Sequence, residues 1–455
     1  MKEPRPLPAE AREAALQALL RMEQDGAYLN LALPPLLEKL NKEDKGLAVQ
    51  LARGTVQRLN TLDWALNYFS HRPVRTLVPW LRNLLRLSAY QLLFLDRIPG
   101  YAAVDQAVRL AWRYGNRGTA GLANAVLRRM DREKESLPWP APEEDFIRYL
   151  SLTYSYPLWL AARVVGRMGV KRAEKWCRAG NDPALTAIRP NSLRVTPEKL
   201  INLLEGEGFA ARKSEQTPGM LLVTSGGRVA ETKSFKDGLF TIQGESSGLV
   251  APLLQPRPEK TIIDLCSAPG GKTTHLAELS GDRGRIIALD RHEKRLQLVS
   301  RAAERLGLKS ISTICADGRS AGDLRLPAPE AVLVDAPCSG IGVIRRLPEI
   351  KWRRSEDDFL GFQKQQTELL TAAGKLLRPG GRLLYSVCTN EPEETTQVAD
   401  IFEHGSGRKE FTRFDLSSLL PGPLQQSRES DTAIHLYPDL HGMDGFFIVL
   451  WEKSG

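Results

Sequence analysis

The stretch TIIDLCSAPGGKTTHLAEL, residues 261–279, decides the fold of the C-terminal part of the chain. An apolar, β-branched run leads into a tight Ala-Pro-Gly-Gly turn and then into residues with helical spacing. Four further apolar runs follow, and each ends at an acid, a proline or a cysteine: RIIALD (285–290), STICAD (312–317), AVLVDAP (331–337) and GRLLYSVC (381–388). Strands that alternate with helices in this way predict a doubly wound parallel sheet, a Rossmann-like α/β domain over residues 241–455.

The glycine turn in this stretch indicates what kind of ligand the first strand end meets. Gly271, Lys272 and Thr273 resemble the end of a phosphate-binding loop, but that motif needs a glycine at position 266, which is Cys. The spaced glycines of the dinucleotide fingerprint are also missing. The turn therefore predicts a close approach of the backbone to a ligand that has no pyrophosphate.

Two acids at the ends of the next two strands complete this pattern. Asp290 follows the glycine turn at the distance where a nucleoside site places its ribose-binding carboxylate, and Asp317 is placed to accept from an adenine amino group. Either acid alone also suits the cap of a helix. Three strand ends in series favour a cofactor that contains adenosine, and S-adenosylmethionine fits.

Two of the five cysteines stand at the ends of predicted strands, in AVLVDAPCSG (331–340) and LLYSVCTNEP (383–392). A single buried cysteine is usually an inert small apolar residue, but two at strand ends of one sheet suggest a shared site. The odd number of cysteines and the lack of a CxxC pair argue against a disulfide framework or a zinc site, and for a reducing cytoplasm. The five are Cys177, Cys266, Cys315, Cys338 and Cys388.

Composition and charge describe a multidomain protein with a polyanionic partner. The 455 residues are too many for one core, and no apolar run approaches the roughly 20 residues of a membrane span. The N-terminus has no signal-peptide pattern, so we expect a cytoplasmic protein. Residues 1–140 carry 21 Lys and Arg against 14 Asp and Glu, so that +7 of the net +9 lies there and favours nucleic acid as partner.

Three domains are expected along the chain. Helical periodicity covers residues 10–134 and predicts an all-α domain over 1–140, which ends at the Pro-rich stretch REKESLPWPAPEED (132–145). Residues 141–240 mix helical and strand-like pieces and predict a small α+β module. The strand-like pieces are NSLRVT (191–196), MLLVTS (220–225) and LFTIQG (239–244). At the other end of the chain, residues 432–453 predict two strands, an antiparallel edge of the main sheet.

Three motifs resemble those of the bacterial Sun/Fmu (RsmB) methyltransferases, which make 5-methylcytosine in 16S ribosomal RNA. They are DLCSAPGGKTTH (264–275), VDAPCSGIGVIRRLPEIKW (334–352) and LLYSVCTNEPEE (383–394). The resemblance implies a NusB-like RNA-binding first domain, a ferredoxin- or RRM-like module and a methyltransferase domain. Val387 stands where the family usually has Thr, and Ile341 stands where the family usually has the sequence GTG. The implied cofactor contacts are Cys266, Ser267, Ala268, Pro269, Gly270, Gly271, Lys272, Asp290, Asp317 and Asp335.

The resemblance also assigns roles to the two cysteines. Cytosine C5 is a poor nucleophile, and a thiolate that adds to C6 activates it as an enamine. By the likeness Cys388 attacks and Cys338 assists release, while Asp335 hydrogen-bonds the N3 edge. The basic stretch IRRLPEIKWRR (344–354) offers a positive field for the thiols and contacts to phosphates, and its last two arginines suit a solvated helix end as well. In the small module Arg189 and Arg194 are equally suited to contact RNA or to flank a strand.

The resemblance to this family implies that the partner is 16S ribosomal RNA or an assembling small-subunit particle. It also implies a monomeric enzyme that binds neither a membrane nor a metal. A transfer-RNA 5-methylcytosine enzyme would share the motifs, and only the NusB-like domain favours ribosomal RNA. A DNA cytosine methyltransferase would use the Pro-Cys cysteine as nucleophile and would not need Cys388. A non-catalytic RNA-binding assembly factor would not need an intact cofactor loop, both thiols and Asp335.

Overall fold

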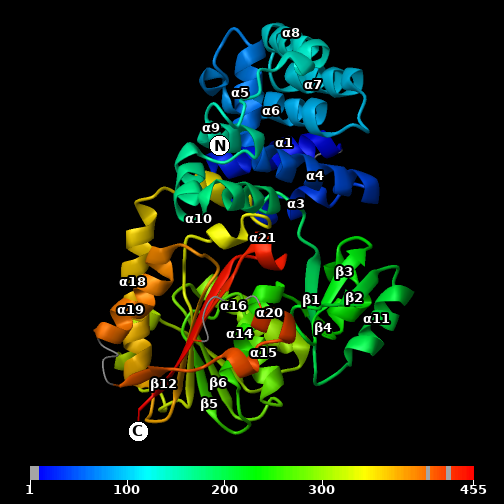
Figure 1. The fold of residues 1–455 in the computed structure, drawn as a ribbon. Coiled ribbons are helices and arrows are strands. Elements are labelled where there is room, and N and C mark those ends of the chain that lie inside the picture. The colour runs from blue at the N-terminus through cyan, green and yellow to red at the C-terminus, as the bar shows by residue number, and fades with distance from the viewer. Residues whose placement is uncertain (1–9, 406–409, 427–431, 455) are drawn as a thin grey trace. The chain divides into compact units, whose positions relative to one another are not determined.

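A computed structural model describes residues 10–405, 410–426 and 432–454 of the chain (Figure 1). Two compact units form. The helical unit comprises the residues up to Asn181 together with Arg346–Arg353, and the sheet unit comprises Asp182–Arg345 and the residues from Arg354 onward. The first nine residues of the predicted N-terminal domain lie outside the described part. Among the described residues, no helix has both the length and the apolar character needed to cross a bilayer.

The helical unit packs amphipathic helices around a core made mainly of leucine and alanine. Its α8 begins at a capping box, in which Asn116 accepts from the backbone of Thr119 and the Thr119 hydroxyl accepts from Asn116 N–H. The predicted all-α fold is confirmed. The helices are α1 (Ala11–Gln24), α2 (Leu29–Ala32), α3 (Pro34–Leu37), α4 (Lys42–Gln57), α5 (Leu59–Phe69), η1 (Val74–Thr76), α6 (Pro79–Phe94), α7 (Gly100–Tyr114), α8 (Arg117–Glu133), η2 (Lys134–Ser136), α9 (Phe146–Thr153), α10 (Leu158–Ala179) and α17 (Ile350–Arg353).

The compact helical unit differs from the predicted first domain in two ways. It continues past residue 140 through α9 and α10 as far as Asn181, and it takes in the distant segment Arg346–Arg353. In that segment Lys351 Nζ donates to Ser155 O at 2.7 Å and to Gln57 O at 2.9 Å, and burial lowers the pKa of Lys351 well below its ordinary value. The basic stretch 344–354 is therefore not one solvated surface, because its lysine is a buried anchor.

The sheet unit begins with a four-stranded antiparallel sheet in the order β2-β3-β1-β4. The predicted strand at 191–196 is wrong: Thr196 caps α11 by accepting from Lys199 N–H, with Pro197 at the first helical position, and the strand lies just before this segment. The α+β prediction for the module is confirmed. Its elements are β1 (Thr186–Pro190), α11 (Pro197–Gly206), β2 (Ala210–Lys213), β3 (Leu221–Ser225), η3 (Val229–Glu231), α12 (Lys233–Lys236) and β4 (Phe240–Ile242).

The main sheet has eight strands in the described residues, in the order β10-β12-β9-β8-β5-β6-β7, with β11 paired to β12. The five strands from β5 to β9 are parallel, as the Rossmann-like prediction requires, while β10, β11 and β12 add antiparallel pairs. The strands are β5 (Thr261–Asp264), β6 (Arg285–Asp290), β7 (Ile311–Cys315), β8 (Ala331–Asp335), β9 (Arg382–Val387), β10 (Phe411–Arg413), β11 (Ala433–Leu436) and β12 (Phe446–Lys453).

Helices cover both faces of this sheet, with α18 and α19 on one face and α14, α15 and α16 on the other (Figure 1). The parallel strands all point their carboxyl ends to one edge, so the loops that follow them meet there. The remaining helices are α13 (Glu245–Gly248), α14 (Val250–Leu254), α15 (Gly271–Leu279), α16 (Glu293–Leu306), η4 (Gly318–Asp323), η5 (Ile341–Val343), α18 (Asp358–Leu376), η6 (Pro392–Glu394), α19 (Thr396–His404), η7 (Ser417–Leu419), α20 (Gly422–Gln426) and α21 (Pro438–His441).

Candidate active site

A cavity of about 240 Å³ opens at the carboxyl edge of the main sheet. Side chains from the ends of β5, β6, β7, β8 and β9 line it, and we call it the thiol cavity. Seven of the residues predicted from the sequence are among those that line it: Cys266, Ala268, Asp290, Asp317, Asp335, Cys338 and Cys388. The other predicted loop residues, Ser267, Pro269, Gly270, Gly271 and Lys272, do not line it.

The glycine loop contributes Cys266 and Ala268 to one wall of the thiol cavity, and the residues around them fix its path. Ser267 fixes the loop to the next strand, because its N–H and its hydroxyl both donate to Leu289 O, at 2.8 and 2.9 Å. Gly270 has a φ of +104°, and a Cβ there would lie 3.0 Å from the Val299 Cα in α16. Only glycine combines this backbone conformation with so close an approach. The loop therefore turns sharply into α15 and leaves the strand end open to a ligand.

Two carboxylates lie along the wall next to this loop. Asp290 is 5% exposed; its Oδ1 accepts from His292 N–H at 2.9 Å, and its Oδ2 lies 3.8 Å from Arg295 Nη1. Asp317 accepts from the Arg319 guanidinium and backbone, and these hydrogen bonds lower the pKa of Asp317. Both acids cap the chain locally and still line the cavity, so capping and ligand binding are compatible here.

The two thiols meet inside the cavity. Cys338 Sγ, in the loop after β8, lies 3.3 Å from Cys388 Sγ, directly after β9. The hydrogen bond with Cys388 and burial raise the pKa of Cys338 well above its ordinary value. Either sulfur can be the donor in this S–H···S contact.

A buried glutamate that the sequence reasoning did not single out holds the Cys338 loop. Glu394, in η6, accepts from Ser339 N–H at 2.8 Å and from Gln366 Nε2 at 3.1 Å, and burial raises the pKa of Glu394 to about 7. Gln366 Nε2 also donates to Pro337 O at 2.9 Å. The residues on both sides of Cys338 are thus fixed to the helix and turn behind them. The acidic run NEPEE (390–394), which follows Cys388, is the sequence feature that could have pointed to Glu394.

Two glycines fix the backbone of Cys388. Gly342 N–H donates to Cys388 O at 3.0 Å, and Gly445 N–H donates to Gly342 O at 2.8 Å. A Cβ on Gly342 would lie 2.1 Å from Gly445 O and 2.9 Å from Cys388 O, so no other residue fits. Val387, where the family usually has Thr, is fully buried in the apolar core on one face of the sheet.

Asp335 lies at the junction of the cofactor loop and the thiols. Lys272 Nζ donates to its Oδ2 at 2.6 Å and Ser386 Oγ donates to its Oδ1 at 2.8 Å. The Lys272 ammonium also lies 5.1 Å from the centre of the Phe446 ring. These contacts orient the Asp335 carboxylate, which is 30% exposed and faces the cavity with free lone pairs.

Arg189 is buried, and of the two roles that the sequence left open for it the structure favours the structural one at the end of a strand. Its side chain is 3% exposed and pairs with Glu278 of α15 at 2.9 Å. Its Nη1 donates to Gly271 O at 2.8 Å and its Nη2 to Thr274 Oγ1 at 3.1 Å. Arg189 therefore ties β1 of the small module to the helix that the glycine loop starts. Arg194 is exposed and donates to Asp237 O at 2.7 Å.

Family models match three parts of this chain. Residues 251–451 match the family described as 16S rRNA methyltransferase RsmB/F, residues 9–132 match the NusB family, and residues 156–230 match the ferredoxin-like domain of RsmF/B-like methyltransferases.

Individual relatives extend over nearly the full length. The probable ribosomal RNA small subunit methyltransferase B of Bacillus subtilis is 36% identical and covers 98% of this chain and 99% of its own. The crystal structure of PH0851 has a TM-score of 0.83 at 27% identity and covers 99% of this chain and 100% of its own. The structure of NSun6 from Pyrococcus horikoshii with SFG has a TM-score of 0.59 at 25% identity and covers 66% of this chain and 99% of its own.

The fold and the cavity at the strand ends, together with these matches, define an RNA methyltransferase that uses S-adenosylmethionine, as the sequence predicted. The chain belongs to the ribosomal RNA small subunit methyltransferase B (RsmB) family. Among the residues that the structure describes, no group of three or more His, Cys, Asp or Glu side chains is arranged to hold a metal ion.

Proposed function

We propose that this protein methylates C5 of a cytosine in 16S ribosomal RNA through a covalent adduct with Cys388. The observation that carries the proposal is the 3.3 Å contact of two thiols in the cavity at the carboxyl edge of the sheet. A single buried cysteine can be an inert residue of the core. Two thiols in contact suit a reaction with two steps, in which one group adds to C6 and the other assists release. The 16S target is supported by the name of the Bacillus subtilis relative and by the match to the NusB family.

The acceptor groups of the thiol cavity fit S-adenosylmethionine. The carboxylate of Asp290 suits the ribose hydroxyls and Asp317 suits the adenine amino group, while Cys266 and Ala268 of the glycine loop line the wall of the same cavity. When bound, S-adenosylmethionine supplies the methyl group as an electrophilic sulfonium. No phosphate-binding arrangement is needed, in keeping with the cysteine at position 266.

The first chemical task belongs to Cys388. Its thiol loses the proton to solvent, the sulfur forms a bond to C6 of the cytosine, and the electrons of the C5–C6 double bond make C5 nucleophilic. Solvent protonates N3 as the ring takes up the negative charge, and Asp335 accepts a hydrogen bond from that N3–H, for which Lys272 and Ser386 hold its carboxylate in place. Because C5 and C6 are hidden in a stacked helix, the target base must lie in a loop or be flipped out.

Release is the task of Cys338. Once C5 carries the methyl group, solvent takes the C5 proton and the N3 proton, the C5–C6 double bond forms again, and the electron pair of the C6–S bond returns to Cys388. The S–H of Cys338, whose pKa is raised, then donates to the emerging thiolate across the observed 3.3 Å contact. Glu394 and Gln366 fix the loop that presents this donor.

Methyl transfer from labelled S-adenosylmethionine to three nucleic acids tests the proposal. Unmodified 16S ribosomal RNA, a mixture of unmodified transfer RNAs and a DNA copy of the 16S sequence are offered in parallel, and the product nucleoside is identified after digestion. We expect 5-methylcytidine in 16S RNA alone. Methylation of transfer RNA instead would move the enzyme to the neighbouring class, and any other methylated nucleoside would overturn the cytosine-C5 assignment.

A further inference from the structure

A second cavity, of about 350 Å³, lies within the helical unit, and we call it the arginine cavity. We propose that it binds one nucleotide of single-stranded RNA, with the base against Trp352 and the phosphodiester at Arg75. The inference rests on the proposed function only in taking RNA as the substrate. Trp352 comes from the segment Arg346–Arg353, so the cavity forms only because this segment packs with the first helices.

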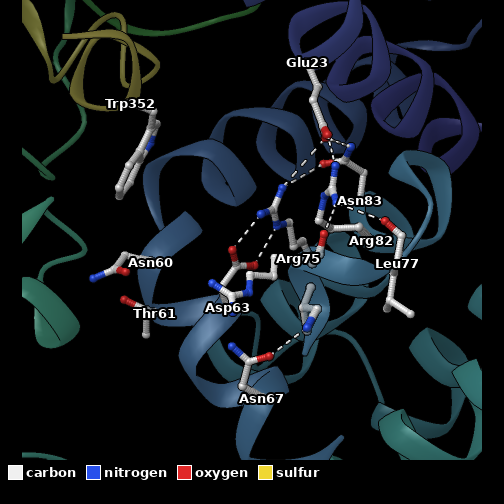
Figure 2. A network of polar contacts seen from close by, with 12 residues as sticks. Glu23, Asn60, Thr61, Asp63, Asn67, Arg75, Leu77, Arg82, Asn83 and Trp352 are labelled. Carbon is white, nitrogen blue, oxygen red and sulfur yellow. Dashed lines mark hydrogen bonds and ion pairs between the residues drawn. The ribbon is translucent and has the colours of Figure 1, made fainter. Parts of the chain in front are cut away.

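Carboxylates hold two of the arginines of the cavity in fixed positions (Figure 2). Arg82 pairs with Glu23, and Arg86 Nε and Nη2 donate to the two oxygens of Asp63, both at 2.6 Å. The Arg82 and Arg86 side chains are each only 15% exposed. Pairing of this kind orders the guanidinium groups before a ligand arrives, so little side-chain entropy remains to be lost on binding.

Arg75 is the arginine of this cavity that stays available. Its own carbonyl accepts from Arg82 Nη1 at 2.9 Å, which fixes its backbone, while its exposed side chain makes no hydrogen bond or ion pair within the described residues. Figure 2 shows Arg75 beside the network of Glu23, Arg82 and Asp63. An unpaired guanidinium at the mouth of a cavity suits a phosphodiester, which it binds with two hydrogen bonds.

The opposite side of the cavity is apolar and aromatic. Trp352 is partly buried, and its Nε1 donates to Val56 O at 2.7 Å, so the ring is held in one orientation. Leu59 and Met22 line the cavity with it. In Figure 2 Trp352 lies to one side of the polar network. An immobilised indole next to a phosphate-binding arginine is the arrangement on which single-stranded nucleic acids stack their bases.

Glu349 gives the cavity a preference among bases. It is 1% exposed; its Oε1 accepts from Leu29 N–H at 2.9 Å, while its Oε2 is buried without a hydrogen-bond partner. A buried carboxylate oxygen without a donor is costly, and a donor on the ligand would relieve that cost. Cytosine, adenine and guanine each carry an exocyclic amino group, whereas uracil offers only its ring N3–H, which lies between two carbonyl oxygens that a carboxylate repels. The arginine cavity should therefore favour a base with an amino group over uracil.

The test compares the binding of fluorescein-labelled oligocytidylate and oligouridylate, nine nucleotides long, to the full-length protein by anisotropy over a range of salt concentrations. One phosphate contact to a single strand contributes about 0.7 to the salt slope, so Arg75→Gln should lower that slope by about 0.7 and the affinity about fourfold at 0.15 M salt. Arg117→Gln is the matched control, since Arg117 is exposed, unpaired among described residues and outside the cavity.

Glu349→Gln tests the base preference and keeps the acceptor for Leu29 N–H. We expect wild type to bind oligocytidylate more tightly than oligouridylate and Glu349→Gln to bring the two affinities together. Equal losses for Arg75→Gln and Arg117→Gln, or no preference for cytidine in wild type, would overturn the proposal.

If a thermal melt shows that Glu349→Gln does not fold, the comparison of Arg75→Gln with Arg117→Gln decides by itself. Methyl transfer at saturating RNA should not change in the control, Arg117→Gln, whose residue lies outside the cavity. Binding is measured without S-adenosylmethionine, so a failure of the methylation proposal leaves this result readable.

Discussion

The thiol cavity and the arginine cavity are built in different ways. Around the thiols, buried groups fix one another: Glu394 holds the Cys338 loop, Gly342 holds Cys388, and Arg189 holds the helix of the cofactor loop. In the arginine cavity, partly exposed ion pairs hold the cations, and Arg75 is exposed. Chemistry needs positions fixed to a fraction of an ångström, whereas electrostatic binding tolerates small displacements. Substitutions should therefore cost much around the first cavity and little around the second.

The largest loss of stability is expected for Arg189→Met. The substitution leaves Glu278 buried without its partner at 2.9 Å, and breaking a buried pair in this way costs about 3–5 kcal/mol of unfolding free energy. Urea denaturation measures it. Arg194→Met, five residues further along on an exposed position, should change stability by less than about 0.5 kcal/mol. Equal, small losses for both would mean that Arg189 does not clamp the helix.

Next in size is a pH effect of Glu394. Burial raises the pKa of this carboxyl from its ordinary 4.5 to about 7, so the folded state binds the proton more tightly than the unfolded state. Stability is then greatest below about pH 4.5, falls as the pH rises to about 7 and levels off above it, by about 3 kcal/mol in all. In Glu394→Gln the free energy of unfolding, measured by urea denaturation at a series of pH values, should lack this part of the decline.

Part of the decline should survive in Glu394→Gln, because burial also raises the pKa of Asp264 to about 7. An unchanged pH dependence in the variant would show that Glu394 is not buried as a neutral acid behind Cys338.

A smaller loss of stability but a large loss of activity is expected for Gly342→Ala. The new Cβ would meet Gly445 O at 2.1 Å and must push the Cys388 backbone aside, which costs about 1–3 kcal/mol of stability and about 100-fold in kcat. Gly361→Ala is the control, because that helical position has no atom within 4 Å of a Cβ and should gain up to about 1 kcal/mol. Full activity of Gly342→Ala would show that Cys388 tolerates displacement.

The smallest effect is expected in the arginine cavity. Arg86→Gln breaks the ion pair between Arg86, which is 15% exposed, and Asp63, which is 31% exposed. The loss of unfolding free energy in a urea melt should be about 1 kcal/mol or less. A loss as large as that of Arg189→Met would erase the contrast between the two cavities.

The residues of the thiol cavity could be predicted from the sequence because they follow strands. Each apolar run ends at its functional residue, and a parallel sheet brings all those ends to one edge, so Cys266, Asp290, Asp335, Cys338 and Cys388 come together without any knowledge of packing. The side-chain partners were not predictable in the same way. Glu394 meets a loop that lies 55 residues away in the sequence.

The boundaries and the basic residues show where sequence patterns are not enough. Periodicity identifies the helices, yet Lys351 stands in a stretch of arginines, and only tertiary structure shows that it is buried against Ser155 and Gln57. For Arg189 the sequence left RNA contact and a strand-flanking role equally open, and only its pairing with buried Glu278 decides between them. The segment at 191–196 is different, since Thr196 followed by Pro197 is a helix start that local chemistry already marks.

The most direct test of the account replaces the two thiols one at a time and follows protein and RNA on a denaturing gel. Cys388→Ala should form no adduct and transfer no methyl group. Cys338→Ala should still attack and methylate but release slowly, so a protein–RNA band that depends on S-adenosylmethionine should accumulate. Cys315→Ala, an exposed cysteine outside the cavity, should turn over normally. An adduct trapped by Cys388→Ala, or normal turnover by Cys338→Ala, would contradict the assignment.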